Sequence, residues 1–200
     1  MTQIDSDVII IGAGAAGLFC AQLLGKAGIS VVVLDHANKA GKKILMSGDG
    51  RCNFTNLDVA PHHYISQNPH FVRSALAKFS PYHFLDYLTT HHIAYHEREH
   101  GQLFCDNSAR DIVDMLLSEC QAGCVSIRLN STITDVCHQL DKFIVQIQPK
   151  QGEAYTLTSH MLVVATGGLS IPTMGATGFG YQLGQHFGHR LIPTCAALVP

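Results

Sequence analysis

The chain has 200 residues, of which 46% are hydrophobic and 14% charged, and its formal net charge at pH 7 is −2. This length and composition are typical of one globular domain spanning residues 1–200, or of one domain with an inserted segment. The charge excludes a general attraction to nucleic acids or acidic membranes, and no segment has the length and apolarity of a membrane span. Seven cysteines without a paired C-x-x-C pattern favour reduced thiols in a cytoplasmic protein.

The first predicted element is a buried strand that ends in a glycine-rich turn. The apolar run leads into Gly12, Gly14 and Gly17, spaced G-x-G-x-x-G, and an apolar helix follows. In this pattern the first glycine permits a tight turn, the second lets the backbone approach a pyrophosphate, and the third allows the helix to pack on the strand. The N–H groups that open the helix, including those of Ala15 and Ala16, face the anion. The sequence therefore predicts a dinucleotide site.

A second buried strand is predicted at 30–34, and it ends in Asp35. This acid follows the glycines by about 20 residues, which is the usual spacing in dinucleotide-binding folds. A carboxylate there can accept hydrogen bonds from both ribose hydroxyls and would repel a 2′-phosphate. The site therefore favours FAD or NAD over NADP.

The segment 36–60 has no long periodicity and is interpreted as an extended functional loop. Short helices are expected to begin at Asn68–Pro69 and at Ser80–Pro81, since each pair offers a capping residue and a proline for the first turn. Ser108 is expected to cap a longer helix that Gly123 ends. The apolar face of that helix comprises Ile112, Val113, Leu116, Leu117 and Cys120.

Alternating polar and apolar residues after this helix predict a β-meander. Breakers at Pro149 and Gly152 separate its last two segments. The alternating segments are 124–129, 132–137, 143–148 and 155–158.

A buried strand at 161–164 is then expected to return the chain to the parallel sheet. It runs into Ala165, Thr166 and Gly167, so that its end lies beside the first glycine turn. A last helix is expected over 181–187. The predicted fold is a Rossmann-like α/β domain with a parallel sheet and an inserted β-meander.

The segment Gly41–Asn56 contains the unusual run Ser-Gly-Asp-Gly-Arg-Cys-Asn-Phe-Thr-Asn. Together with Gly12–Gly17 and Ala165–Gly168, it resembles the YhiN-type bacterial flavoproteins, also called the aminoacetone-oxidase-like family. The resemblance covers essentially the whole chain, and the middle segment is its most discriminating part because generic dinucleotide folds lack it. The resemblance implies FAD as the cofactor.

The same resemblance implies where FAD binds. The adenosine end lies near the first glycine turn and Asp35, and the flavin end near 47–53. Lys43 lies close to the cofactor, the backbone around Ile133 meets the adenine, and 165–167 pass near the pyrophosphate. The implied cofactor-binding residues are Gly12, Gly14, Ala15, Ala16, Gly17, Asp35, Lys43, Ser47, Gly48, Arg51, Cys52, Asn53, Ile133, Ala165, Thr166 and Gly167.

Two features depart from the family pattern. Asp49 stands where members usually hold a small or amide residue, and a carboxylate there would disfavour the anionic reduced flavin unless Arg51 or a lysine compensates it. Family members also continue beyond 197–200 into a substrate domain and return to complete the FAD site. The chain is therefore expected to be the amino-terminal half of such an enzyme.

The reaction class implied by the resemblance is flavin-mediated hydride transfer. Some members of the family have a segment like Gln102–Cys105 where others have a segment that ends in proline. Members of the first kind, which this chain resembles, are associated with reducing uridine in ribosomal RNA to dihydrouridine. In that reaction hydride goes to C6 of uracil and an acid protonates C5. The alternatives are oxidation or reduction of small amines or other small molecules, and a flavin-binding module without turnover. A nicotinamide site is not apparent, and the electron donor and oligomeric state are open.

Two cysteines are candidates for the acid. Cys52 and Cys105 lie in segments expected to approach the flavin, and a thiol with an ordinary pKa is mostly protonated at pH 7. Cys105 is favoured as the donor because Cys52 resembles a cofactor contact. The alternative for each is a small packed residue.

The run His96-Glu97-Arg98-Glu99-His100 matches the H-E-x-x-H pattern of zinc hydrolases. That chemistry needs both histidines on one face of a helix. Here a strand is expected before His96, and Gly101 follows at once. A metal site is therefore not predicted.

Overall fold

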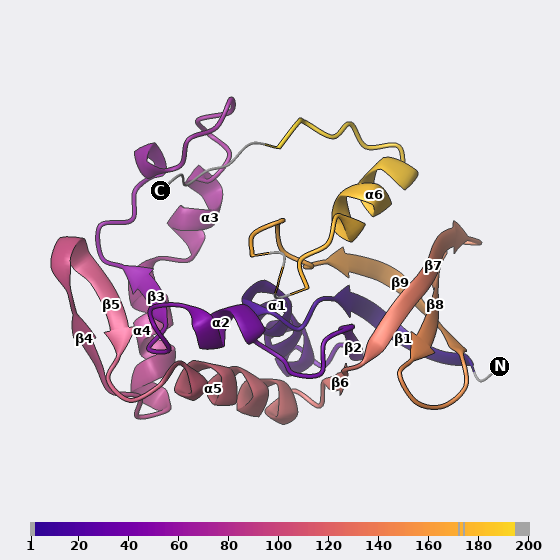
Figure 1. Cartoon of the computed structure of the whole chain (residues 1–200), viewed down its shortest axis with the longest axis horizontal. Helices are drawn as coiled ribbons and strands as arrows, with labels where there is room; N and C mark the ends of the chain where they lie inside the picture. The colour runs from indigo at the N-terminus through magenta and orange to yellow at the C-terminus, as the bar shows by residue number, and fades with distance from the viewer. Residues whose placement is uncertain (1–2, 172, 174, 195–200) are drawn as a thin grey trace. The chain divides into compact units, whose positions relative to one another are not determined.

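The computed structural model describes residues 3–171, 173 and 175–194, so the expectation about 197–200 lies outside the described residues. The chain divides into two compact units. One comprises the residues up to Ala40 and those from Cys120 onward, and the other comprises Gly41–Glu119. Figure 1 labels the helices and strands of both units in chain order.

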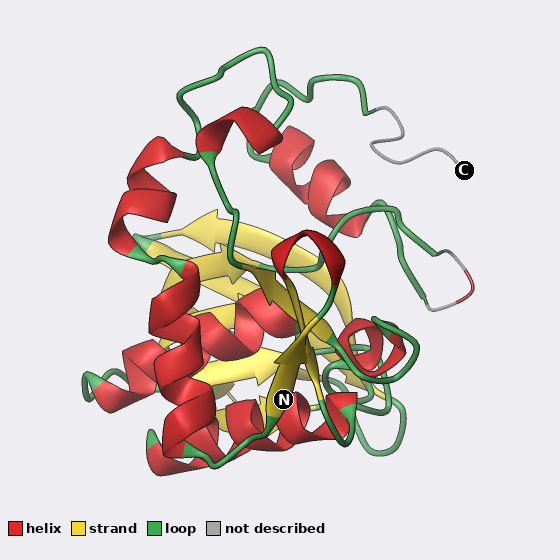
Figure 2. Cartoon of the chain, turned by 90° about the vertical axis from the view of Figure 1, so that its left-hand side faces the viewer, coloured by secondary structure: helices red, strands yellow, loops and turns green. Residues whose placement is uncertain are grey.

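The first unit is built on a six-stranded sheet in the order β6-β2-β1-β9-β8-β7. Figure 2 distinguishes the helices, strands and loops of the chain by colour. The strands are β1 (Gln3–Ile11), β2 (Val31–Leu34), β6 (Ser126–Arg128), β7 (Ser131–Gln139), β8 (Lys142–Pro149) and β9 (Tyr155–Val164), and the helices are α1 (Ala15–Lys26) and α6 (Phe179–His186).

The middle of this sheet is parallel. Strand β1 pairs in parallel with β2 and β9, β6 pairs in parallel with β2, and β8 and β7 continue the sheet in antiparallel order. This order confirms the predicted Rossmann-like α/β fold, with β1 leading through a glycine turn into α1.

Two strand predictions were wrong in detail. The segment 126–128 joins the parallel sheet beside β2 instead of the meander. The predicted separate segments 155–158 and 161–164 form the single strand β9, because β1 pairs with both halves of it. The antiparallel extension of the sheet therefore consists of β7 and β8, paired through β8 with β9.

The hydrophobic core of the first unit is formed by buried side chains of β1, β2, β7, β8, β9 and α6. Strand β2 is buried at every position. Its sequence is therefore an uninterrupted apolar run, as is typical of a strand covered on both faces. No helix among the described residues has both the length and the apolar character needed to cross a membrane. The buried cluster comprises Ile9, Ile11, Val32, Leu34, Val136, Val145, Ile147, Leu157 and Leu183.

The second unit contains a three-stranded antiparallel sheet in the order β3-β5-β4. The segment predicted as a loop contains α2 and β3, both too short to leave a periodic pattern. The elements are α2 (Lys42–Met46), β3 (Asn53–Asn56), the 3-10 turn η1 (Pro61–His63), α3 (Arg73–Lys78), α4 (Pro81–Thr90), β4 (Tyr95–Glu97), the 3-10 turn η2 (Glu99–Gly101), β5 (Gln102–Cys105) and α5 (Ala109–Ala122), whose last residues belong to the first unit.

Local capping chemistry decides where these helices begin. Ser80 starts α4 in a capping box, in which its N–H donates to Nδ1 of His83 over 3.0 Å, as expected for a Ser-Pro start. Ser108 accepts a hydrogen bond from the N–H of Arg110, which confirms the predicted start of α5. The helix start at Asn68 was wrong: its side chain accepts from the N–H of His70 in a separate turn, and α3 begins later.

Candidate functional site

The turn between β1 and α1 leaves room only for glycine at two of its three glycines. Gly12 has φ +116°, and a Cβ there would lie 2.3 Å from the carbonyl oxygen of Ala165. A Cβ on Gly17 would lie 1.8 Å from the oxygen of Gly12. At Gly14, in contrast, a Cβ would meet nothing within 4 Å. The first and third glycines thus serve close packing, and the second borders open space.

The same turn exposes the amino end of α1. Gly14 is its N-cap, and no side chain of the described chain caps the helix. The first N–H groups of a helix have no partner inside it and carry the positive end of its dipole. Those of Ala15 and Ala16 are therefore suited to binding an anion.

The returning strand β9 brings a second backbone segment to this turn. The N–H of Ala165 donates to the oxygen of Ile11 over 2.8 Å, and Gly12 lies against Ala165. The next residue, Thr166, is covered by α6, since a Cβ on Gly180 would lie 2.5 Å from its hydroxyl oxygen. The end of β9 therefore lies beside the first glycine turn, as expected, through Ala165 and Thr166.

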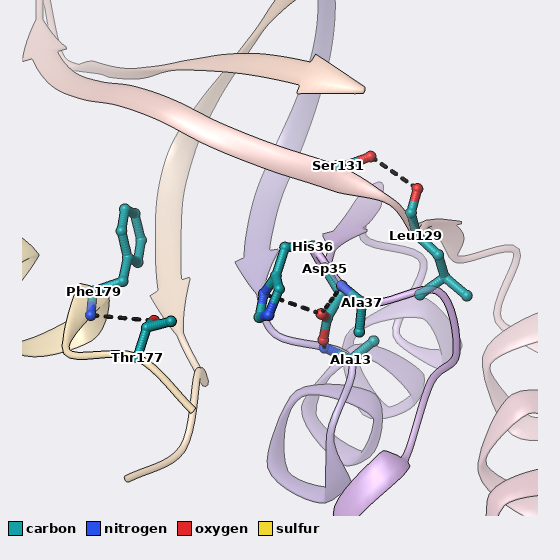
Figure 3. A network of polar contacts seen from close by, with 8 residues as sticks. All are labelled: Ala13, Asp35, His36, Ala37, Leu129, Ser131, Thr177 and Phe179. Atoms are coloured by element: carbon teal, nitrogen blue, oxygen red, sulfur yellow. Dashed lines mark hydrogen bonds and ion pairs between the residues drawn. The ribbon is translucent and has the colours of Figure 1, made fainter. Parts of the chain in front are cut away.

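The Asp35 carboxylate is held at the end of β2 by two backbone donors (Figure 3). Its Oδ2 accepts from the N–H of Ala13 over 2.7 Å, and its Oδ1 accepts from the N–H of Ala37 over 2.8 Å. The ring of His36 lies 3.6 Å from Oδ1. Because a carboxylate offers about four acceptor positions, the oxygens retain capacity for a ligand hydroxyl. Asp35 therefore links the glycine turn to the edge where a ribose would bind.

The start of β7 lies at the same edge of the sheet. The N–H of Ser131 donates to the backbone oxygen of Asp35, and the N–H of Asn130 donates to that of Ala37, each over 2.9 Å. Ile133 follows two residues later and packs against the apolar cluster. The structure thus brings the start of β7 to the same sheet edge as Asp35.

In the second unit, residues 47–53 form a tightly wound segment, termed here the motif loop. The N–H of Cys52 donates to the oxygen of Ser47 over 2.9 Å, which closes the loop on itself. Gly48, Asp49, Gly50 and Cys52 all have positive φ, between 51° and 79°. Such a backbone is costly for Asp49 and Cys52, and strain of this kind is often found at functional sites.

Strand β5 and the start of α5 hold the motif loop in place. The N–H of Cys105 donates to the oxygen of Arg51 over 2.9 Å, and the Arg51 side chain donates to the oxygen of Asp106 over 2.6 Å. The ring of Phe104 packs against Gly48, where a Cβ would lie 2.7 Å from it. The second-unit residues implied as cofactor contacts therefore lie in the motif loop, with Lys43 on the helix that precedes it.

Both candidate thiols are buried beside this loop. Burial raises the pKa of Cys52 above its ordinary value, and a hydrogen bond with Ser47 opposes the shift. Burial, aided by the nearby Cys52, Asp111 and Asp106, raises the pKa of Cys105 to about 12. Both thiols therefore remain protonated at neutral pH, and Cys105 has no exposed surface.

The H-E-x-x-H run forms no α-helix. His96 lies in β4, whereas His100 lies in η2 with φ 58°, so the two rings are not one helical turn apart. His96 Nδ1 instead lies 2.7 Å from Asp106 Oδ1, and the Arg98 Nε–H donates to His96 Nε2 over 3.2 Å. No local sequence pattern predicts this network, because the pairing of β4 with β5 brings Asp106 near His96.

Comparisons with known proteins agree with this architecture. A family model described as the HI0933-like protein Rossmann domain matches residues 6–197. The ribosomal RNA dihydrouridine synthase of Escherichia coli K12 is 52% identical over 97% of this chain and 47% of its own length. That of Haemophilus influenzae is 52% identical over 98% of this chain and 48% of its own length. The chain thus spans about half the length of the curated relatives that it matches.

A solved structure supports the fold alone. The 3-ketosteroid-delta4-(5alpha)-dehydrogenase from Rhodococcus jostii RHA1 superposes with a TM-score of 0.63 at 12% identity, covering 82% of this chain and 46% of that one. The family model covers nearly the whole chain, which confirms the resemblance identified from the motifs. The chain therefore belongs to the HI0933-like Rossmann-domain family.

Proposed function

We propose that this chain is the FAD-binding part of an oxidoreductase that reduces uridine in ribosomal RNA to dihydrouridine. The observation that carries the proposal is its 52% identity, along nearly all its length, to two proteins named ribosomal RNA dihydrouridine synthase. The glycine turn and the anchored Asp35 of the first unit support the proposal, because they suit the adenosine end of a dinucleotide.

The first-unit residues fit the adenosine diphosphate part of FAD. Gly14 borders open space at the uncapped end of α1, which suits a pyrophosphate, and Ala165–Gly167 offer a second backbone segment beside it. Asp35 would accept hydrogen bonds from the ribose, and the backbone near Ile133 would meet the adenine. The remaining contacts, at the flavin end, would come from Lys43, Ser47, Gly48, Arg51, Cys52 and Asn53.

Reduced FAD, when bound, supplies a hydride for C6 of uracil. The chain must then provide a proton for C5. A donor has to touch the substrate, and Cys105 has no exposed surface, whereas Cys52 is 5% exposed and belongs to the motif loop itself. On this structure we therefore place Cys52 ahead of Cys105 as the proton donor, although the sequence favoured the reverse order.

The function is tested by FAD reconstitution followed by turnover. The purified chain is expected to bind FAD and show a flavin absorbance spectrum. Joined to the carboxy-terminal half of a family member and chemically reduced, the FAD-bound chain is expected to convert uridine in unmodified ribosomal RNA to dihydrouridine, measured by mass spectrometry of the digested RNA. FAD binding without dihydrouridine would favour the flavin-binding module without turnover, and failure to bind FAD would reject the cofactor as well.

Replacing Asp35 with alanine is expected to weaken FAD binding by about 10- to 100-fold, on the scale of charge-assisted hydrogen bonds. The change also leaves the N–H of Ala13, a 1% exposed residue, without its acceptor, so the melting temperature should fall. Asp35→Asn retains an acceptor oxygen and is expected to bind FAD with intermediate affinity. Titration calorimetry compares the three proteins, and unchanged affinity in Asp35→Ala would remove the ribose contact from the proposal.

A further inference from the structure

A chain of three hydrogen-bonded side chains lies beside the motif loop. Arg98 Nε–H can only donate, so Nε2 of His96 must accept its hydrogen bond. The His96 proton therefore resides on Nδ1 and is donated to Asp106. Arg98 is further fixed by its backbone N–H, which donates to the oxygen of Gln102 over 2.8 Å. The order Asp106–His96–Arg98 thus fixes the direction of the guanidinium group.

The aromatic ring of Phe104 supports the same cation. The guanidinium carbon of Arg98 lies 4.2 Å from the ring centroid, and the His96 ring is stacked on Phe104 at 6.2 Å. His96, Phe104 and Asn53 occupy one row across the three strands, so their side chains share one face of the sheet. This face carries the motif loop residue Asn53 at one end and Arg98 beside the other.

The charge of Arg98 is not neutralised within the described part of the chain. Its side chain is exposed, and its Nε–H donates to the His96 ring rather than to a carboxylate. The neighbours Glu97 and Glu99 form no ion pair with it among the described residues. The two terminal guanidinium nitrogens therefore present a fixed pair of donors to a ligand.

We propose that Arg98 is a phosphate-binding residue whose ligand is a phosphodiester group of the RNA substrate. This inference rests on the proposed function. Two parallel N–H donors match two phosphate oxygens, and a guanidinium group that is already oriented loses less freedom on binding than a flexible one. The Asp106–His96 pair positions Arg98 and does not itself contact the ligand.

A second feature of the same unit favours RNA over an acidic peptide. Residues 59–85 contain no aspartate or glutamate, and they carry Arg73 and Lys78. Unpaired RNA is bound by cations that contact its backbone and by aromatic rings that stack on its bases, and a stretch without carboxylates does not repel it. The exposed aromatic side chains of this segment are Tyr64, Phe71, Phe79 and Tyr82.

The test measures binding of a short fluorescent oligouridylate by anisotropy at several salt concentrations. Arg98→Ala is expected to weaken binding about tenfold and to reduce the salt slope by about one phosphate contact. Arg98→Lys should keep the slope but not the full affinity, because lysine retains the charge and loses the paired donors. His96→Phe should weaken binding about threefold with an unchanged slope, since the cation remains but its orientation is lost.

Arg110→Ala is the matched control, because Arg110 is also an exposed arginine of the second unit. It should bind RNA like the wild type. The proposal is overturned if Arg98→Ala matches this control, if the wild type does not bind the oligouridylate, or if Arg98→Ala lowers affinity for FAD instead of RNA. FAD binding and dihydrouridine formation by the wild type judge the proposed function separately, because neither measurement depends on the variants.

Discussion

Replacing Gly14 with valine is expected to abolish FAD binding and to leave the chain folded. Gly14 has φ −90° and ψ −169°, an extended conformation that valine adopts readily. The new side chain would meet no atom of the protein within 4 Å at its Cβ, so it would occupy the space in front of the α1 N–H groups. Affinity measured by titration calorimetry should fall more than about 100-fold, or roughly 3 kcal/mol.

The contrast with Gly17 separates loss of binding from loss of fold. In Gly17→Ala the new Cβ would lie 1.8 Å from the oxygen of Gly12, so the turn itself must move. Gly17→Ala is therefore expected to melt at a much lower temperature by circular dichroism, whereas Gly14→Val should melt like the wild type. Equal FAD affinity in Gly14→Val and the wild type would show that the cofactor does not approach this backbone.

The sequence predicts the first unit well because its signals are local. The glycine spacing, the apolar run of β2 and the position of Asp35 all lie within one β-strand, helix and strand sequence. The hydrogen bonds that Asp35 makes to Ala13 and Ala37 are set by how the turn closes. Only the structure shows that two backbone N–H groups of the protein itself anchor this carboxylate.

The second unit was less predictable because long-range pairing stabilises its elements. Strand β3 has four residues and pairs with β5, which lies about 50 positions later in the chain. The motif loop was found by resemblance, and its positive φ angles at Asp49 and Cys52 have no signature beyond the adjacent glycines. His96 was singled out for zinc chemistry, whereas its partners Asp106 and Arg98 became apparent only from the pairing of β4 with β5.

Burial of the thiols also depends on this pairing. Cys105 is the last residue of β5 and lies opposite Tyr95, so its side chain belongs to the face of the sheet away from Phe104 and Asn53. No sequence pattern predicts that either cysteine is buried. The raised pKa values of both thiols follow from this burial. Cys105 has no exposed surface, whereas Cys52 is 5% exposed. The prediction for Cys52 below rests on this difference in exposure.

Replacing Cys52 with alanine is expected to slow dihydrouridine formation by 10²- to 10⁴-fold, the usual cost of losing a positioned general acid. A thiol donates its proton only while protonated, and the raised pKa of Cys52 keeps it protonated through neutral pH. Alanine retains the left-handed backbone at position 52 with the same constraint on φ, so the motif loop should keep its conformation. The measurement is the single-turnover reoxidation of reduced flavin by uridine-containing RNA, followed by stopped-flow absorbance.

Cys105→Ala is the matched control, since it removes a neighbouring buried thiol that has no exposed surface. It should bind FAD and transfer hydride within a few-fold of the wild-type rate, with a modest loss of thermal stability from the small cavity that it leaves. If Cys105→Ala is the slow variant and Cys52→Ala is not, the donor is the residue that the sequence favoured, and its burial must be relieved during turnover. If both variants react at the wild-type rate with bound flavin, neither thiol supplies the proton, and both are packing residues.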